Sequence, residues 1–94
     1  MAIAFSSKVS ISKDVMIRQV GDESVLLDLN SAKYLGLDDV STRIWGVLTS
    51  GTSIQSAHDT LVAEFDVDPE QLRKDLGDFI LELLDLGLVR VEQP

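Results

Sequence analysis

Histidine, cysteine and clustered carboxylates are the residues whose spacing would first reveal catalysis or metal binding. The chain has no cysteine and a single histidine, His58. This removes thiol nucleophiles, disulfides, thiolate zinc sites and iron–sulfur ligation, and leaves mainly carboxylates to hold a metal. The sequence contains no glycine-rich phosphate loop, no Gly-x-Ser-x-Gly motif and no Ser/His/Asp set. We therefore expect no enzyme activity, no metal and no cofactor, and a surface or half-buried structural role for His58.

Charge and hydropathy limit the partners and the location. Sixteen acidic and eight basic side chains give a formal net charge of −8, which opposes binding to phosphate backbones because Lys and Arg supply most nucleic-acid affinity. The first apolar run ends at Phe5 without a basic region before it, so no signal peptide is expected. No stretch approaches the roughly 18 apolar residues that span a membrane. We expect a cytoplasmic protein that binds neither nucleic acid nor membrane.

The first half of the sequence predicts a small antiparallel sheet in one domain. Residues 1–14 are irregular and are interpreted as a poorly defined N-terminal lead-in, with at most a short extra strand around Val9 and Ile11. Residues 15–20 and 23–29 are rich in β-branched and apolar residues and flank the turn Gly21-Asp22. Residues 33–37 predict a third strand. Such a meander leaves its third strand as an edge unless something else covers it.

The second half predicts three helices and a possible last strand. Asp38 or Asp39 caps a first helix that carries Trp45, expected in the core, and Gly51 ends it. Thr52 to Gln55 have capping-box form and open a second helix. Asp68-Pro69 begins a third helix, and Gly87 is well placed to end it. The predicted class is therefore α+β, a three-stranded antiparallel sheet followed by three helices, with winged-helix-like content.

The third helix has an unusually wide apolar face, about 160° on a helical wheel where an ordinary surface helix needs about 100°. Its members are Leu72, Leu76, Phe79, Ile80, Leu83, Leu84 and Leu86. Either the sheet covers the excess, or the helix borders a second apolar partner. The same helix carries an acidic stripe of Asp75, Asp78, Glu82 and Asp85, typical of a solvated face or of contact with a basic peptide or enzyme. This stripe argues against a DNA-recognition helix.

Several segments share their order and spacing with a known family: Ser24–Asp39, Thr42–Trp45, Leu48, Gly51, Thr52, Asp66–Glu70, Phe79–Leu83 and Leu86–Val89. Together they resemble the PqqD family over about residues 15–91. The resemblance implies that residues 15–94 form a recognition element for ribosomally synthesised, post-translationally modified peptides. In such an element, the leader segment of a precursor peptide adds as a fourth strand to the third strand and lies against the third helix.

The resemblance also implies the peptide-binding residues. They are Lys33, Tyr34, Leu35 and Gly36 on the strand, and Leu72, Arg73, Leu76, Phe79 and Ile80 on the helix. Tyr34 and Leu35 point to opposite faces of the strand, and the sequence leaves open which of them meets the peptide.

The pathway is ranked by one departure from the family pattern. The subgroup that serves pyrroloquinoline quinone synthesis usually has proline and glycine where this chain has Leu27 to Asn30, and the form here is more similar to stand-alone leader-binding proteins of lasso peptide pathways. The expected function is to capture a leader and present it to a processing enzyme, first a lasso leader peptidase. The alternatives are a peptide chaperone in the quinone or another modified-peptide pathway, a winged-helix DNA-binding regulator, or a small enzyme subunit.

Overall fold

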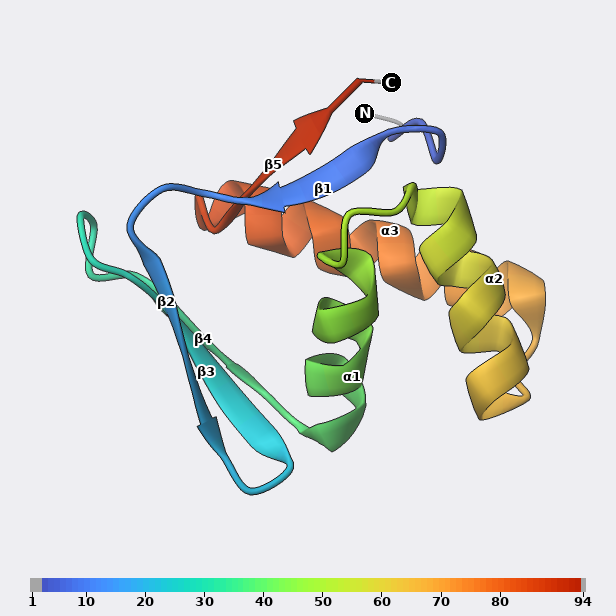
Figure 1. Ribbon diagram of the computed structural model, residues 1–94, viewed down its shortest axis with the longest axis horizontal. Helices are drawn as coiled ribbons and strands as arrows, with labels where there is room; N and C mark the ends of the chain where they lie inside the picture. The colour runs from blue at the N-terminus through green and yellow to red at the C-terminus, as the bar shows by residue number, and fades with distance from the viewer. Residues whose placement is uncertain (1–2, 94) are drawn as a thin grey trace.

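The computed structural model describes residues 3–93 (Figure 1). These residues form three helices and five strands, and the strands make up two sheets. The strands are β1 (Lys8–Ile11), β2 (Val15–Val20), β3 (Glu23–Asp28), β4 (Tyr34–Leu37) and β5 (Val89–Glu92), and the helices are α1 (Asp39–Leu48), α2 (Ile54–Phe65) and α3 (Pro69–Asp85). The larger sheet has the order β2-β3-β4 and is antiparallel. The predicted α+β class is confirmed.

The sheet is built from two hairpins. Gly21 has a φ of 64° in the β2–β3 turn, a conformation that glycine adopts without a Cβ penalty. The β3–β4 connection places Ala32 at a φ of 61°, and the Asp28 carbonyl accepts a hydrogen bond from the Ala32 N–H at 2.8 Å. This turn delays the start of β4 to Tyr34, one residue after the predicted start at Lys33.

Each helix begins at a side-chain cap. The Asp38 carboxylate accepts a hydrogen bond from the Ser41 N–H at 2.8 Å, and the Asp68 carboxylate accepts one from the Glu70 N–H at 3.0 Å. The second helix is capped by Ser53, whose hydroxyl accepts from the Ser56 N–H at 3.1 Å. The predicted capping box from Thr52 is therefore wrong by one residue.

The third helix ends at Asp85, and Gly87 terminates it as predicted. Gly87 has a φ of 73°, and its N–H and that of Leu88 donate to the carbonyls of Leu84 and Leu83. These are the two bonds of a Schellman cap, which turns the chain directly into β5.

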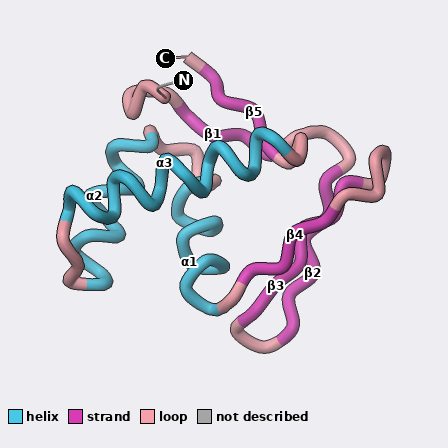
Figure 2. The backbone as a smooth tube through the Cα atoms, turned by 180° about the vertical axis from the view of Figure 1, so that it is seen from behind, coloured by secondary structure: helices cyan, strands magenta, loops and turns pink. Residues whose placement is uncertain are grey.

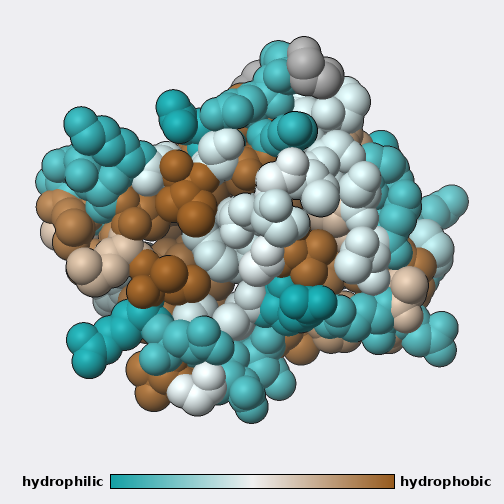
Figure 3. Space-filling model, viewed as in Figure 1, coloured by the Kyte–Doolittle hydropathy of each residue, from teal (hydrophilic) through white to brown (hydrophobic). Residues whose placement is uncertain are grey.

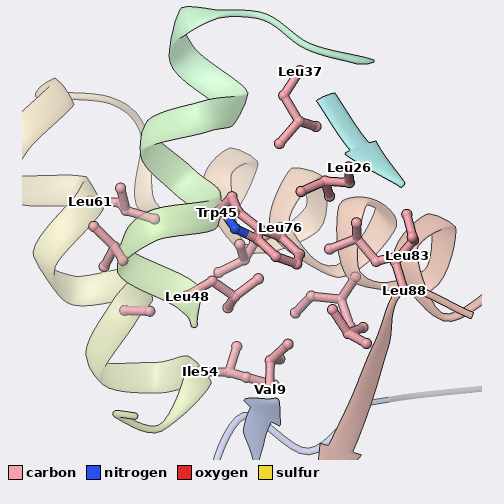
Figure 4. Close-up of a cluster of buried hydrophobic side chains, with 14 of the residues drawn as sticks. Val9, Leu26, Leu37, Trp45, Leu48, Ile54, Leu61, Leu76, Leu83 and Leu88 are labelled. Atoms are coloured by element: carbon pink, nitrogen blue, oxygen red, sulfur yellow. The ribbon is translucent and has the colours of Figure 1, made fainter. Parts of the chain in front are cut away.

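One apolar core joins the larger sheet, the helices and the small β1–β5 sheet (Figure 4). It contains Val9, Leu26, Leu37, Trp45, Val47, Leu48, Ile54, Ala57, Leu61, Leu72, Leu76, Ile80, Leu83, Leu88 and Val89. Trp45 lies on α1, between the sheet and the other helices, and is buried as predicted. The first helix thus covers one face of the β2–β3–β4 sheet, called the inner face below, and the opposite face is called the outer face.

The predicted lead-in, residues 1–14, contains the short extra strand that the sequence allowed. This strand, β1, pairs antiparallel with β5 and buries Val9. The carbonyls of Phe5 and Ser7 accept hydrogen bonds from the N–H groups at the start of α2. Met1, Ala2 and Pro94, the outermost residues of the two predicted segments, lie outside the described residues. Within the described chain, no helix is long and apolar enough to cross a membrane.

Candidate peptide-binding site

The backbone of β4 has one side bonded to β3 and one side open. The Asp28 N–H donates to the Lys33 carbonyl at 2.9 Å, which marks this pair as hydrogen-bonded. Hydrogen-bonded and non-hydrogen-bonded pairs alternate along an antiparallel ladder, so Leu35 and Leu37 direct their N–H and C=O groups toward β3. Tyr34 and Gly36 therefore direct theirs toward the open edge, where no other strand of residues 3–93 pairs.

The ladder on the other side of β3 gives the same result independently. The Leu29 N–H donates to the Asp14 carbonyl at 3.0 Å, and the register then makes Leu27 and Val25 the β3 residues bonded to β2. The intervening residues, Leu26 among them, must bond to β4. Sequence reasoning identified the strand but missed this alternation, because it depends on the geometry of the β3–β4 turn.

The side chains of β4 divide between the two faces. Leu35 stands opposite Leu26 on the inner face, where it is half-buried and packs against the core. Tyr34 lies on the outer face and is 69% exposed. The structure thus places the two side chains: Leu35 points toward the helical side, and Tyr34 points away from it.

The predicted helix residues do not form one surface. Leu72, Leu76 and Ile80 are 7%, 1% and 0% exposed and belong to the core. Phe79 is half-buried at the edge of this core row. In Figure 2, α3 and the edge strand β4 lie on the same side of the molecule. Of the predicted apolar helix residues, Phe79 therefore offers the most side-chain surface to a ligand.

Arg73 is located away from Phe79 and is held by other contacts. Six residues at about 100° each place the two side chains about 120° apart, on opposite sides of the buried row. The Arg73 guanidinium lies 3.9 Å from the centre of the Phe5 ring and donates to the Gln55 side-chain carbonyl at 3.0 Å. It ties α3 to the N-terminal segment and to α2.

The charges near the site are mainly acidic. Four acidic residues are exposed along α3: Asp75, Asp78, Glu82 and Asp85. The Lys74 Nζ lies 3.8 Å from the Asp78 Oδ2. At the base of β4, the Asp28 carboxylate accepts a hydrogen bond from the Asn30 N–H at 2.9 Å, which lowers the pKa of Asp28 below its usual range. Ionised Asp28 thus helps to hold the β3–β4 turn that presents the open edge.

His58 has a structural position, but it is more buried than predicted. It is 6% exposed, and its Nε2 donates to the Pro69 carbonyl at 2.8 Å, which connects α2 to the first turn of α3. The Phe5 ring packs edge-on with its centre 6.1 Å away. Among residues 3–93, no three His, Asp or Glu side chains come together in a group that could hold a metal ion.

Two solved structures resemble this one over most of the chain. One is described as TbiB1 in complex with the TbiA(beta) leader peptide. It is 37% identical, with 86% of this chain and 94% of that chain covered and a TM-score of 0.80. The other is described as lasso peptide synthetase B1 complexed with the leader peptide. It is 23% identical, with coverages of 88% and 98% and a TM-score of 0.79, and it supports the fold alone.

Sequence comparison with curated proteins finds no match. A family model described as coenzyme PQQ synthesis protein D (PqqD) matches residues 23–89, which include β3, β4 and all three helices. This range is well over half of the chain, so the protein belongs to the PqqD family.

Proposed function

We propose that this protein binds the leader segment of a ribosomally made precursor peptide and presents it to a processing enzyme, foremost a lasso peptide leader peptidase. The observation that carries the proposal is the open edge of β4, where Tyr34 and Gly36 leave their backbone donors and acceptors unpaired by any strand of residues 3–93. The 37% identical structure, described as a complex with a leader peptide, supports this use of the fold.

Strand addition explains how such an edge selects a peptide. Main-chain hydrogen bonds to Tyr34 and Gly36 supply affinity, and side-chain contacts on alternate residues supply specificity. A leader residue opposite Leu35 places its side chain on the inner face, the side that the helices cover, and we expect it to meet Phe79 there. Its neighbours point to the outer face. The inner face then favours apolar leader residues at every second position.

The chemistry of the described residues favours binding over catalysis. The single histidine, His58, is 6% exposed and donates its Nε2–H to the Pro69 carbonyl, and the part of the chain that the structure describes brings no metal-binding group together. We place the protein in the cytoplasm, where precursor peptides are made.

A second candidate is a peptide chaperone in pyrroloquinoline quinone synthesis. The description of the matching family model favours it. The sequence Leu27-Asp28-Leu29-Asn30, without proline or glycine, favours the lasso pathway instead. Both candidates use the same open edge, and they differ in which precursor binds.

The proposal is tested by titrating the isotope-labelled protein with synthetic leader peptides from a lasso precursor and from a quinone precursor. We expect the largest amide shifts at residues 33–36 and around Phe79, and an unchanged peptide mass after prolonged incubation. Shifts confined to α1 and α2 would refute the docking edge. Cleavage or modification of the peptide by the pure protein would refute the non-catalytic role.

A further inference from the structure

The outer face of the β2–β3–β4 sheet carries mainly apolar side chains although it faces solvent, and Arg18 and Glu23 are its charged members. An antiparallel sheet with one covered face normally carries polar residues on the other. Four apolar side chains on this face are well exposed: Met16 (51%), Val20 (67%), Val25 (41%) and Tyr34 (69%). Leu27 lies among them and is half-buried. Figure 3 shows brown hydrophobic groups beside teal hydrophilic ones over the part of the molecule that holds this sheet.

The strand register gathers these side chains into adjacent rows. Met16, Leu27 and Tyr34 are paired across the three strands, and Val25 pairs with Gly36 and with Arg18 in the next outer-face row. No helix or strand of the described chain covers these rows, since α1 lies on the inner face (Figure 1). They form one patch rather than scattered exposed residues.

A hollow of about 400 Å³ opens beside these rows. Its lining includes Val20, Val25 and Gly36, with the acidic residues Glu23 and Asp38 among its other members. Gly36 has no side chain, and the space where its Cβ would stand is free within 4 Å. The hollow therefore offers apolar walls with acidic groups beside them to a protruding side chain.

The charges argue against a second copy as the occupant. Two copies would bring formal charges of −8 together, and like charges of this size oppose association. A partner that complements the hollow has an apolar protrusion with Lys or Arg residues placed to face Glu23 and Asp38.

The patch is also continuous with the leader-binding edge. Tyr34 and Gly36 lie on the outer face and also hold the open backbone groups of β4. An added leader strand would widen the outer face and place alternate side chains on it. A protein that docks there would contact the domain and its bound leader together.

We propose that the outer face docks the enzyme that processes the precursor, through an apolar protrusion with basic residues around it. This proposal rests on leader binding at β4 and adds a surface for the partner enzyme. It assigns different roles to the two sides of one strand: the edge holds the leader, and the face recruits the enzyme.

Val25→Glu is the test variant because Val25 lies on the central strand, away from the open edge. Leu81→Glu is the matched control, since Leu81 on α3 is 40% exposed, like Val25 at 41%. Three quantities are measured for each variant: the melting temperature, the Kd for a labelled leader, and the rate at which the leader peptidase encoded beside the precursor gene cleaves the full precursor. A fourth assay measures binding of that peptidase to the leader-free protein.

We expect both variants to bind the leader within twofold of the unmodified protein. Val25→Glu should slow cleavage at least tenfold and weaken peptidase binding, and Leu81→Glu should change neither by more than twofold. Normal cleavage by Val25→Glu would overturn the proposal, as would a leader-binding loss equal to the cleavage loss. Light scattering that shows a dimer broken by Val25→Glu would identify a second copy as the occupant and overturn it too. Failure of the unmodified protein to bind any leader would instead refute the proposed function, and the peptidase-binding assay would still test the surface.

Discussion

Replacing Gly36 by proline tests the backbone geometry of the open edge directly. Proline lacks the N–H group and is tolerated at edge positions where that group does not belong to the ladder. The Gly36 N–H points away from β3, so Gly36→Pro should keep the sheet and change the unfolding free energy by no more than about 1 kcal/mol. Leu35→Pro, one residue earlier, removes an N–H that bonds to β3 and should unfold the strand.

The expected loss of affinity follows from the number of groups that the edge offers. Tyr34 and Gly36 provide two donors and two acceptors to a leader strand. Loss of one backbone hydrogen bond costs about 1 kcal/mol, and about 3 kcal/mol if the leader carbonyl is left buried without a partner. The Kd should therefore rise between about 5-fold and about 150-fold.

Gly36→Ala is the matched control because it keeps the N–H, and its new Cβ meets no atom within 4 Å. Fluorescence polarisation with a labelled leader gives both dissociation constants, and urea unfolding confirms that both variants fold. The backbone assignment fails if Gly36→Pro and Gly36→Ala bind the leader equally within twofold. It also fails if Leu35→Pro folds and loses less affinity than Gly36→Pro.

Three further predictions concern the surroundings of the site. Arg73→Ala should leave the leader Kd within twofold and lower the unfolding free energy by about 0.5–1 kcal/mol in urea titrations, because it removes the stacking on Phe5; an affinity loss above fivefold would return Arg73 to the binding site. The Ser41 N–H lowers the pKa of Asp38 below its ordinary 3.8, so the stability that the ionised cap contributes is present above that value and is lost as the pH falls through the lowered pKa. Asp38→Asn keeps the capping oxygen, so urea unfolding between about pH 5 and pH 2 should show a weaker pH dependence, and an unchanged pH dependence would exclude Asp38 as a contributor. In a gel-shift titration at physiological salt we expect no DNA complex, given the net charge of −8, and a submicromolar complex would favour a regulator.

Local sequence signals were enough to predict the helices and strands, but not every contact between these elements. Proline after Asp68 and glycine at position 87 determine the ends of α3 through backbone geometry alone, so both could be predicted. The β1–β5 pairing joins residues about 80 positions apart through two four-residue strands. Such short strands carry too little periodicity to reveal each other, and tertiary packing decides whether they pair.

In the candidate site, too, the sequence predicted the elements but not the contacts between them. The wide apolar face of α3 was visible in the sequence, and most of its width is explained by burial in the core. A helical wheel does not tell which flank faces the sheet, so Arg73 was grouped with Phe79 although Phe5 and Gln55 hold it elsewhere. Tyr34 and Gly36 have free backbone N–H and C=O groups because the alternate residues of β4 bond to β3. The turn around Ala32 determines which residues alternate in this way.

An open edge strand exposes a protein to pairing with other chains, and the features of β4 limit this risk without closing the edge. The strand has four residues, and α1 begins two residues after it ends, so it cannot lengthen in that direction. Only Tyr34 and Gly36 present free backbone groups, too few for stable pairing with an arbitrary strand without side-chain contacts. The net charge of −8 opposes pairing between identical copies. Under the proposed function, a leader that combines the matching backbone register with apolar side chains toward Phe79 meets all of these conditions, and the shortness of the edge then contributes to selectivity as much as the side chains around it.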